Sequence, residues 1–362
     1  MRRLVLLLAI TAACAREAPA PVQAIARATD LGATARDPGP ATASTDFEAF
    51  TPGAIDGQFD WKSLGGAGAP PPANPLDTHC AVYDHVIEAL DHKDAPGSFR
   101  TRALRISNAV TSGCYADQTF SARAGDIAGQ AGAVSLKRDG SADYALPGSS
   151  LRNHFDAEWT FISTTPGALQ AGLEVVVNPA RGDDHRMSWL RMADLADGIA
   201  ITFGERANPA APGDIQLRPV VKGLKRKEAH TLRLSIDFLD GPANDVARVY
   251  VDDRLRYVGT TWETYYALDP SGVANFGGNP PAVNRLMFRT GSDAHRGIPG
   301  DAAPALLGKG FLFDGVVTRV WSVPATPAAC AGNGWQDLRD WDGKRFGNQK
   351  DCERADRQLT PR

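Results

Sequence analysis

The stretch HTLRLSIDFLDGPANDVARVYVDD, residues 230–253, contains two runs in which apolar and polar residues alternate, separated by a turn rich in Gly, Pro, Asn and Asp. A period of two places successive side chains on opposite faces of a β-strand. One face of the first run, which we expect to face the core, carries His230, Leu232, Leu234, Ile236 and Phe238; the other carries Thr231, Arg233, Ser235 and Asp237. The stretch therefore predicts a β-hairpin that serves as scaffold.

Aspartates gather in the turns of this hairpin, namely Asp240, Asp245, Asp252 and Asp253. Asp is common in turns because its side chain hydrogen-bonds the local backbone, and we interpret these four residues in that way. A structural Ca2+ site is the alternative, because hard cations are held by several clustered oxygen atoms. We expect no other cofactor, and we expect His230 to be a core histidine rather than a catalytic one.

The same alternation recurs along most of the chain, with turn residues between the runs. It is clearest in residues 157–163, 172–178, 187–192, 198–203, 284–290 and 310–321. A helical period is found only in residues 81–90, which a strand with its turn also explains. Many short strands and almost no helix predict an all-β protein, an antiparallel β-sandwich or jelly roll.

Composition and charge narrow the class of partner. The 362 residues are 43% hydrophobic and 22% charged, with a formal net charge of -3 and no basic block, so a nucleic-acid partner is not expected. Two arginines, an apolar run over residues 4–10 and small residues before Cys14 have the order of a bacterial secretory signal. No apolar stretch reaches the roughly 20 residues that span a bilayer, so only a lipid would attach the chain to a membrane.

Changes in composition divide the chain into five parts. Residues 1–14 form the signal, residues 15–45 an Ala- and Pro-rich disordered tether, and residues 46–323 the sandwich. Residues 324–329 form a linker before a small C-terminal element, residues 330–362. Apart from Cys14, the exported part keeps four cysteines, an even number that suits an oxidising compartment and allows three pairings: Cys80, Cys114, Cys330 and Cys352.

Several strings, among them ALRISNAVTSGCYADQTFSA (residues 103–122), GTTWETYYALDP and NRLMFRTG, together resemble a group of exported bacterial proteins with a concanavalin A-like, laminin-G-type sandwich. The resemblance covers residues 47–323. No activity is established for this group, so the resemblance implies a fold and an extracellular setting rather than a reaction.

Two shorter segments carry resemblances of their own. CAGNGWQDLRDWDGKRFGNQKDC, residues 330–352, resembles a C-terminal element of secreted bacterial proteins, a Cys followed by Gly-Trp and later by Phe-x-Asn-Gln-x-Asp-Cys. This implies a Cys330–Cys352 disulfide and leaves Cys80 to pair with Cys114. LLAITAAC resembles a lipoprotein cleavage box, which implies acylation of Cys14; ordinary cleavage after Ala13 or Ala15 is the alternative.

The string MSWLRM places Trp189 and Arg191 on one face of a strand whose other face carries Leu190 and Met192. An aromatic plane stacks on the apolar face of a sugar ring, and the Arg side chain supplies hydrogen-bond donors in a fixed fork. We therefore predict a glycan-binding face at these residues, extended by Arg289 on another strand. A solvated outer face is the alternative.

The string TWETYY is the other concentration of aromatic residues, with Trp262, Tyr265 and Tyr266. It predicts either a platform for a glycan or the packing of a connection onto the edge of a sheet.

The function that these features favour is a noncatalytic, monomeric recognition or adhesion module, either secreted or held in the cell envelope by lipid. Its partner would be a glycan or a cell-surface polymer. The alternative is a polysaccharide hydrolase or lyase with Glu158 and Glu174 as its carboxyl pair, which requires the two groups to lie about 5 to 10 Å apart on neighbouring strands. The sequence contains no Gly-x-Ser-x-Gly, His-Glu-x-x-His or phosphate-binding glycine motif.

Overall fold

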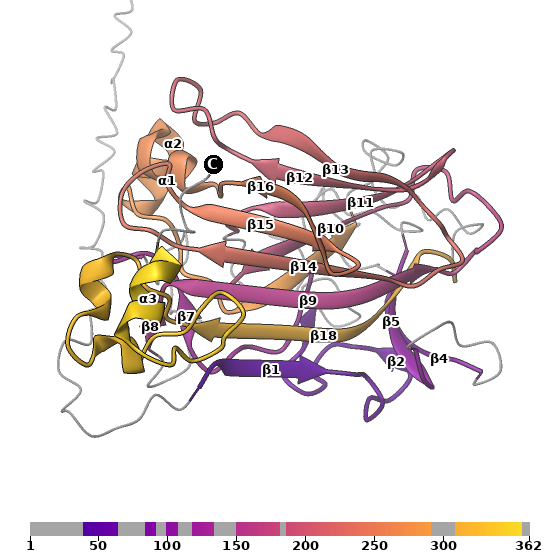
Figure 1. Cartoon of the computed structure of the whole chain (residues 1–362). Coiled ribbons are helices and arrows are strands. Elements are labelled where there is room, and N and C mark those ends of the chain that lie inside the picture. Colours follow the sequence, from indigo (N-terminus) through magenta and orange to yellow (C-terminus); the bar gives the residue numbers. More distant parts are fainter. Residues whose placement is uncertain are drawn as a thin grey trace, which may run out of the picture.

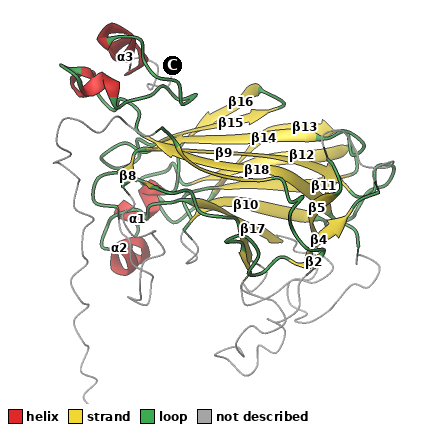
Figure 2. Cartoon of the chain, turned by 90° about the horizontal axis from the view of Figure 1, so that it is seen from below, coloured by secondary structure: helices red, strands yellow, loops and turns green. Residues whose placement is uncertain are grey.

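The computed structural model describes residues 39–63, 84–91, 99–107, 118–133, 150–181, 186–290 and 308–356. Within these ranges the protein is an antiparallel β-sandwich, as the alternation predicts, with two large sheets packed face to face (Figures 1 and 2). Cys14, Cys80 and Cys114 lie outside the described residues. The predicted lipidation and the predicted Cys80–Cys114 bridge therefore remain predictions.

The first sheet, sheet A, has nine strands in the described residues, and eight of them follow one hydrogen-bonded path. In spatial order these are β16 (Arg254–Gly259), β15 (Val246–Val251), β14 (His230–Asp237), β9 (His154–Ser163), β18 (Phe311–Trp321), β5 (Arg102–Ile106), β4 (His85–Ala89) and β2 (Gly53–Ala54). The ninth strand, β1 (Ala41–Thr45), pairs with β18. The strand β1 lies inside the stretch that the sequence assigns to the tether, so the folded body begins earlier than predicted.

The second sheet, sheet B, has seven strands in the described residues. In spatial order they are β13 (Gln216–Leu224), β12 (Gly198–Glu205), β11 (Trp189–Leu195), β10 (Glu174–Ala180), β17 (Arg285–Thr290), β6 (Gln118–Phe120) and β3 (Lys62–Ser63). A short parallel pair, β7 (Ile127–Ala128) and β8 (Leu151–Arg152), completes the described strands.

Residues 230–253 form strands β14 and β15, which pair with each other near one edge of sheet A, and β14 also pairs with β9. The predicted core face of β14 is confirmed, because Leu232, Leu234 and Ile236 are fully buried in the main hydrophobic cluster. The turn after β15 places Asp252 and Asp253 at positive φ, 50° and 60°. The Asp252 carboxylate accepts one hydrogen bond from the Thr231 backbone N–H and lies 2.9 Å from His230 Nδ1. These contacts agree with the interpretation of this aspartate as a turn residue.

Short helices lie toward one end of the sandwich, and the sequence analysis missed them (Figures 1 and 2). The first two are α1 (Glu263–Leu268) and α2 (Pro270–Phe276), which together follow strand β16. Helices of six and seven residues are too short to show a clear 3.6-residue period, and α2 depends instead on the Asp269 carboxylate, which accepts hydrogen bonds from the first-turn N–H groups. Of residues 81–90, where the sequence has a helical period, residues 85–89 form strand β4.

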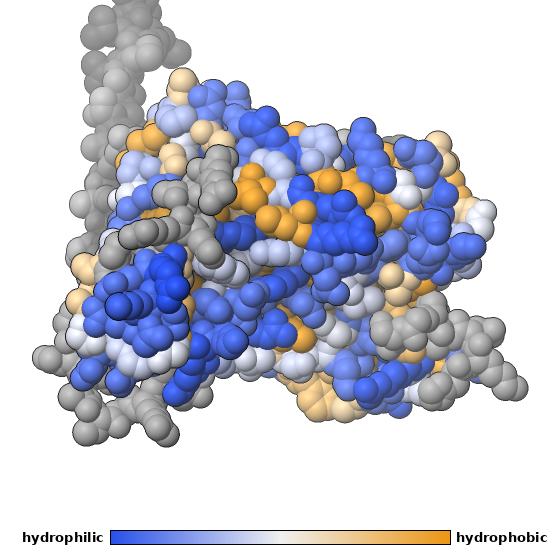
Figure 3. All heavy atoms as spheres, viewed as in Figure 1, coloured by the Kyte–Doolittle hydropathy of each residue, from blue (hydrophilic) through white to orange (hydrophobic). Residues whose placement is uncertain are grey.

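The C-terminal element packs against the outer face of sheet A. It contains η2 (Pro327–Cys330), η3 (Gly334–Gln336) and α3 (Gln349–Asp356), and the predicted Cys330–Cys352 disulfide links η2 to α3. None of the described helices is long and apolar enough to cross a membrane. In the view of Figure 3 the surface is hydrophilic over the C-terminal element and over the middle of sheet A, and it is apolar toward β16.

Candidate functional site

The outer face of sheet B carries the residues that the sequence singled out on strand β11. Leu190 and Met192 are fully buried in the core, and Trp189 and Arg191, which alternate with them, point to the opposite side and are partly exposed. The predicted assignment of the two strand faces is therefore correct. Whether these residues bind a ligand is a separate question, which depends on what surrounds them.

The strand register brings Arg289 to the same row of the face as Arg191. Val176 of β10 pairs with Arg191 on one side and with Arg289 on the other. Neighbouring strands are about 4.8 Å apart, so the two arginine backbones lie about 10 Å from each other across the face. Arg191 forms an ion pair with Glu174, whose side chain is 12% exposed.

The indole of Trp189 is held in one orientation by its neighbours. Its ring lies edge-on to the ring of Trp262, with 5.4 Å between the centroids. It also lies directly over Gly204 of β12, where an added Cβ would come within 1.6 Å of Trp189 Nε1. The Trp262 indole in turn donates a 2.9 Å hydrogen bond to the carbonyl of Gly204. Only a glycine at position 204 leaves room for this arrangement.

Arg206, which follows β12, belongs to this site although no pattern in the sequence singles it out. Its guanidinium carbon lies 4.7 Å from the centroid of Trp262 and 3.9 Å from the centroid of Tyr265. Its Nε and Nη1 atoms are buried and have no hydrogen-bond partner among the described residues. Burial, which opposes the charged form, lowers the pKa of the Arg206 guanidinium, and the positive charge of Arg186 lowers it further.

Other buried polar atoms on this face are also left without a hydrogen bond. Asn178 donates from Nδ2 to the carbonyl of Ser188 at 2.8 Å, but its Oδ1 has no partner within the described ranges. The same holds for Trp189 Nε1 and Arg191 Nε. A buried polar group without a partner costs about 1 to 3 kcal/mol, so each of these atoms calls for an explanation, such as a bound ligand or a water molecule.

The residues of the TWETYY segment divide between the two predicted roles. Trp262 and Tyr266 are only 5% and 3% exposed and belong to the core cluster, and the Tyr266 hydroxyl donates to the carbonyl of Arg186. These two residues pack α1 against the sheet rather than presenting a free platform. Tyr265 is partly exposed and stacks on Arg206.

The proposed carboxyl pair of the enzyme alternative is not assembled. Glu158 lies on β9 in sheet A, and Glu174 lies on β10 in sheet B. Both side chains alternate with core residues, so they point outward from opposite sides of the sandwich. The condition that the two strands be neighbours in one sheet fails, because alternation along each strand does not tell which strands pair.

Acidic groups are also buried at the base of α1. Glu263 Oε2 accepts hydrogen bonds from the backbone N–H groups of Asn244 and Asp245, and the Asp245 carboxylate accepts one from the Thr261 hydroxyl at 2.6 Å. Burial raises the pKa of Glu263 to about 7, and burial together with the Glu263 charge raises the pKa of Asp245. Among the described residues, no group of three or more His, Cys, Asp or Glu side chains is placed to hold a metal ion.

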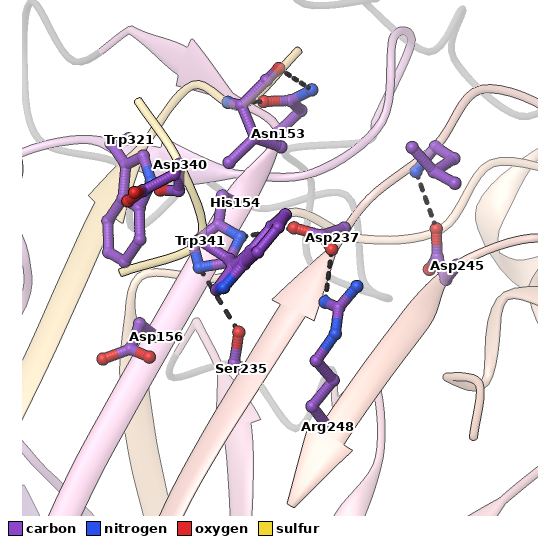
Figure 4. A network of polar contacts seen from close by, with 12 residues as sticks. Asn153, His154, Asp156, Ser235, Asp237, Asp245, Arg248, Trp321, Asp340 and Trp341 are labelled. Carbon is purple, nitrogen blue, oxygen red and sulfur yellow. Dashed lines mark hydrogen bonds and ion pairs between the residues drawn. The ribbon is translucent and has the colours of Figure 1, made fainter. Parts of the chain in front are cut away.

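The outer face of sheet A holds a different polar cluster, under the C-terminal element (Figure 4). His154 Nδ1 lies 2.5 Å from the Asp237 carboxylate, His154 Nε2 lies 3.5 Å from the Ser235 hydroxyl, and Arg248 donates to the other Asp237 oxygen at 2.5 Å. A histidine placed between a serine and an aspartate is also the arrangement of a hydrolase catalytic triad. However, all three side chains are fully buried, and the Trp321 ring packs at a tilt against the His154 ring, with 4.0 Å between the centroids. The cluster is therefore part of the packed interior of this fold.

Comparison with known proteins adds distant likenesses only. No protein-family model matches the sequence, and no curated protein matches it. A sialidase aligns with 80% of this chain over 19% of its own length, at 12% identity and a TM-score of 0.38.

Two further solved structures are similar at the same level. The alginate lyase Aly36B in complex with alginate trisaccharide aligns with 78% of this chain and 98% of its own, at 10% identity and a TM-score of 0.37. A carbohydrate esterase of the Shiga toxin-encoding bacteriophage phi24B aligns with 78% and 99%, at 14% identity and a TM-score of 0.35. Likenesses this distant carry no conclusion about the function of this chain.

Proposed function

We propose that the protein is a noncatalytic extracellular recognition module, and that the outer face of sheet B around Trp189 binds a glycan or a cell-surface polymer. One observation carries the proposal: Asn178, Trp189 and Arg191 each keep a buried hydrogen-bonding atom that no described residue satisfies. Sugar hydroxyl groups donate and accept hydrogen bonds, so their chemistry matches both the donor atoms of Trp189 and Arg191 and the acceptor atom of Asn178.

The rigidity of Trp189 supports the same function. Trp262 on one side and the backbone of Gly204 on the other leave the indole little freedom to move. A side chain that is already ordered loses little conformational entropy when a ligand binds, which favours affinity. The mixture of aromatic, arginine and amide groups is also the mixture that sugar recognition uses.

The extracellular setting in this proposal rests on the Cys330–Cys352 disulfide, since such bonds persist in oxidising compartments. The secretory signal over residues 1–14, the tether and the lipid at Cys14 belong to the same proposal. In this arrangement the folded body would stand away from the membrane with the outer face of sheet B open to a polymer.

The proposal is tested by a glycan array with the purified protein, in the presence and absence of calcium, followed by titration of the best ligand. Trp189→Ala should weaken binding roughly tenfold to a hundredfold, because a stacked aromatic side chain contributes on the order of 1 to 3 kcal/mol. Gly204→Ala should weaken binding as well, because the new methyl group displaces the indole without removing it.

Trp335→Ala is the matched control, since Trp335 is also partly exposed but lies in the C-terminal element. It should leave binding unchanged. An array without any ligand would refute the proposal, and so would equal losses in the Trp189 and Trp335 variants. A loss of binding that accompanies unfolding of Trp189→Ala would assign that residue to the core instead.

A further inference from the structure

The charge at one end of the outer face of sheet B points to the chemistry of the ligand. Two guanidinium groups lie against the ring of Trp262, that of Arg206 at 4.7 Å and that of Arg186 at 5.8 Å from the centroid. Like charges this close repel each other, and both lose favourable hydration where they are buried. A negatively charged group beside Arg206 would offset its loss of hydration and its repulsion from Arg186.

No carboxylate of the described residues fills this role at Arg206. Arg206 forms no ion pair within 4.0 Å in these ranges, whereas Arg191, on the neighbouring strand β11, is already paired with Glu174. The acidic side chain that influences Arg206 most is Asp269, whose carboxylate is engaged by the N–H groups of Ser271 and Gly272 at the start of α2. Arg206 is therefore a partly buried cation that forms no ion pair with the described residues.

We infer that the ligand of this face is an acidic polysaccharide, and that Arg206 binds its carboxylate or sulfate group while Trp189 stacks on a neighbouring sugar ring. The inference rests on the proposed function and names the class of its ligand. Both side chains contact Trp262, so a polymer that covers Trp189 brings the acid group of an adjacent residue to Arg206. Arg suits this role because its planar guanidinium matches the geometry of an oxyanion and remains charged even when it is partly buried.

The test compares charged polymers with neutral counterparts of the same backbone on the full-length protein. The probes are polygalacturonate with its carboxyl-reduced form, and dextran sulfate with dextran. We expect one charged polymer to bind and its neutral counterpart to bind roughly tenfold or more weakly, with an affinity that falls as salt is added. The polymer that binds identifies the oxyanion as a carboxylate or a sulfate.

Two arginine variants separate a specific contact from general electrostatics. Arg206→Gln should lower the affinity for the charged polymer roughly tenfold or more and leave the weak binding of the neutral polymer unchanged. Arg256→Gln removes the same charge from an exposed position of β16 on the other sheet and should change the affinity less than about twofold. Arg206→Lys keeps the charge without the fork and should fall between the wild type and Arg206→Gln.

The possible results separate two failures, that of the acidic ligand and that of the proposed glycan-binding function. If the neutral polymers bind as tightly as the charged ones and Trp189→Ala still abolishes binding, the glycan site stands and the acidic ligand is refuted. Equal losses in the Arg206→Gln and Arg256→Gln variants would refute the assignment to Arg206. If neither these polymers nor any member of the array binds, the proposed function itself is wrong.

Discussion

The two outer faces of this sandwich carry similar polar and aromatic residues, but they differ in how completely these residues are paired. On sheet A, Asp156 accepts hydrogen bonds from both Arg233 and Arg319, at 2.6 and 2.8 Å, and Asp237 is shared between His154 and Arg248. The C-terminal element closes over this network, since Arg233 also donates to the carbonyl of Trp341. Charge and hydrogen bonding are completed within the fold.

On sheet B the corresponding groups are left incomplete in the described residues. Arg206 has aromatic neighbours but no carboxylate, and Trp189 and Asn178 have buried atoms without hydrogen bonds. Folding alone gains nothing from such groups, because each has lost water without gaining a partner. This difference supports the proposal that the outer face of sheet B binds a ligand, whereas the network on sheet A stabilises the fold.

The largest effect should follow from breaking the network on sheet A. Asp237→Ala leaves Arg248 and His154 buried without their common partner, and removal of one member of a buried ion pair destabilises a protein by about 3 to 5 kcal/mol. Chemical denaturation monitored by fluorescence measures this. Asp197→Ala, at an exposed turn, is the control and should stay within about 0.5 kcal/mol. A change of the same small size for Asp237→Ala would contradict the assignment of this network to stability.

The second effect concerns the cover over sheet A. The double variant Cys330→Ser, Cys352→Ser removes a disulfide between residues 22 apart, which should destabilise the C-terminal element by about 3 kcal/mol. Hydrogen exchange should then increase in the element and in the underlying ends of β9 and β14. Ligand binding should be unchanged, because the proposed site lies on the other sheet. A loss of binding in this variant would break the separation of the two faces.

The third effect is the pH dependence of the free energy of unfolding. Asp237, on sheet A, and Glu263, beside the sheet B cluster, should contribute to it with opposite signs. Burial opposes the charge of Asp237, but His154 and Arg248 outweigh it and lower the pKa of this carboxyl, so its contribution is lost only as the pH falls below about 4. The pKa of Glu263, which anchors α1 beside the sheet B cluster, is raised from 4.5 to about 7. Its stabilising contribution is complete below pH 4.5 and is lost as the pH rises through about 7.

Replacement of the buried carboxyl tests this sign. Glu263→Gln should reduce the fall in the free energy of unfolding between about pH 4.5 and pH 7, which amounts to at most about 3 kcal/mol for this shift. Denaturation curves at several pH values measure it. Parallel curves for the wild type and the variant across this window would show that Glu263 does not take up a proton on folding.

The smallest effect should be that of the proposed ligand residue on stability. Arg206→Gln removes a partly buried charge that has no described acidic partner, so the free energy of unfolding should change by less than about 1 kcal/mol, or rise slightly. Arg233→Gln on sheet A removes a partner of Asp156 and should destabilise by about 1 to 3 kcal/mol. Equal destabilisation by the two substitutions would mean that Arg206 serves the fold rather than a ligand.

The sequence alone determined which residues face the core. A period of two is a local property, so the alternation in the segments of β11 and β14 correctly placed Leu190 and Leu234 inside and Trp189 and Arg233 outside. The all-β class was predicted in the same way, whereas the Cys330–Cys352 bridge was implied by the resemblance of residues 330–352 to a C-terminal element of secreted bacterial proteins. The ligand-binding role of Trp189 and Arg191 remains a prediction.

Only the tertiary structure decided which segments meet. Arg206 becomes notable because α1, almost 60 residues later in the chain, brings Trp262 and Tyr265 against it, and no local pattern signals that contact. Pairing of strands likewise assigned Glu158 and Glu174 to different sheets and so separated them. Ser235 and Asp237 alternate as surface residues would, yet the C-terminal element, about 100 residues away in sequence, buries them. Alternation along a strand tells which side chains share a face. Which segments of the chain pack against that face depends on long-range packing.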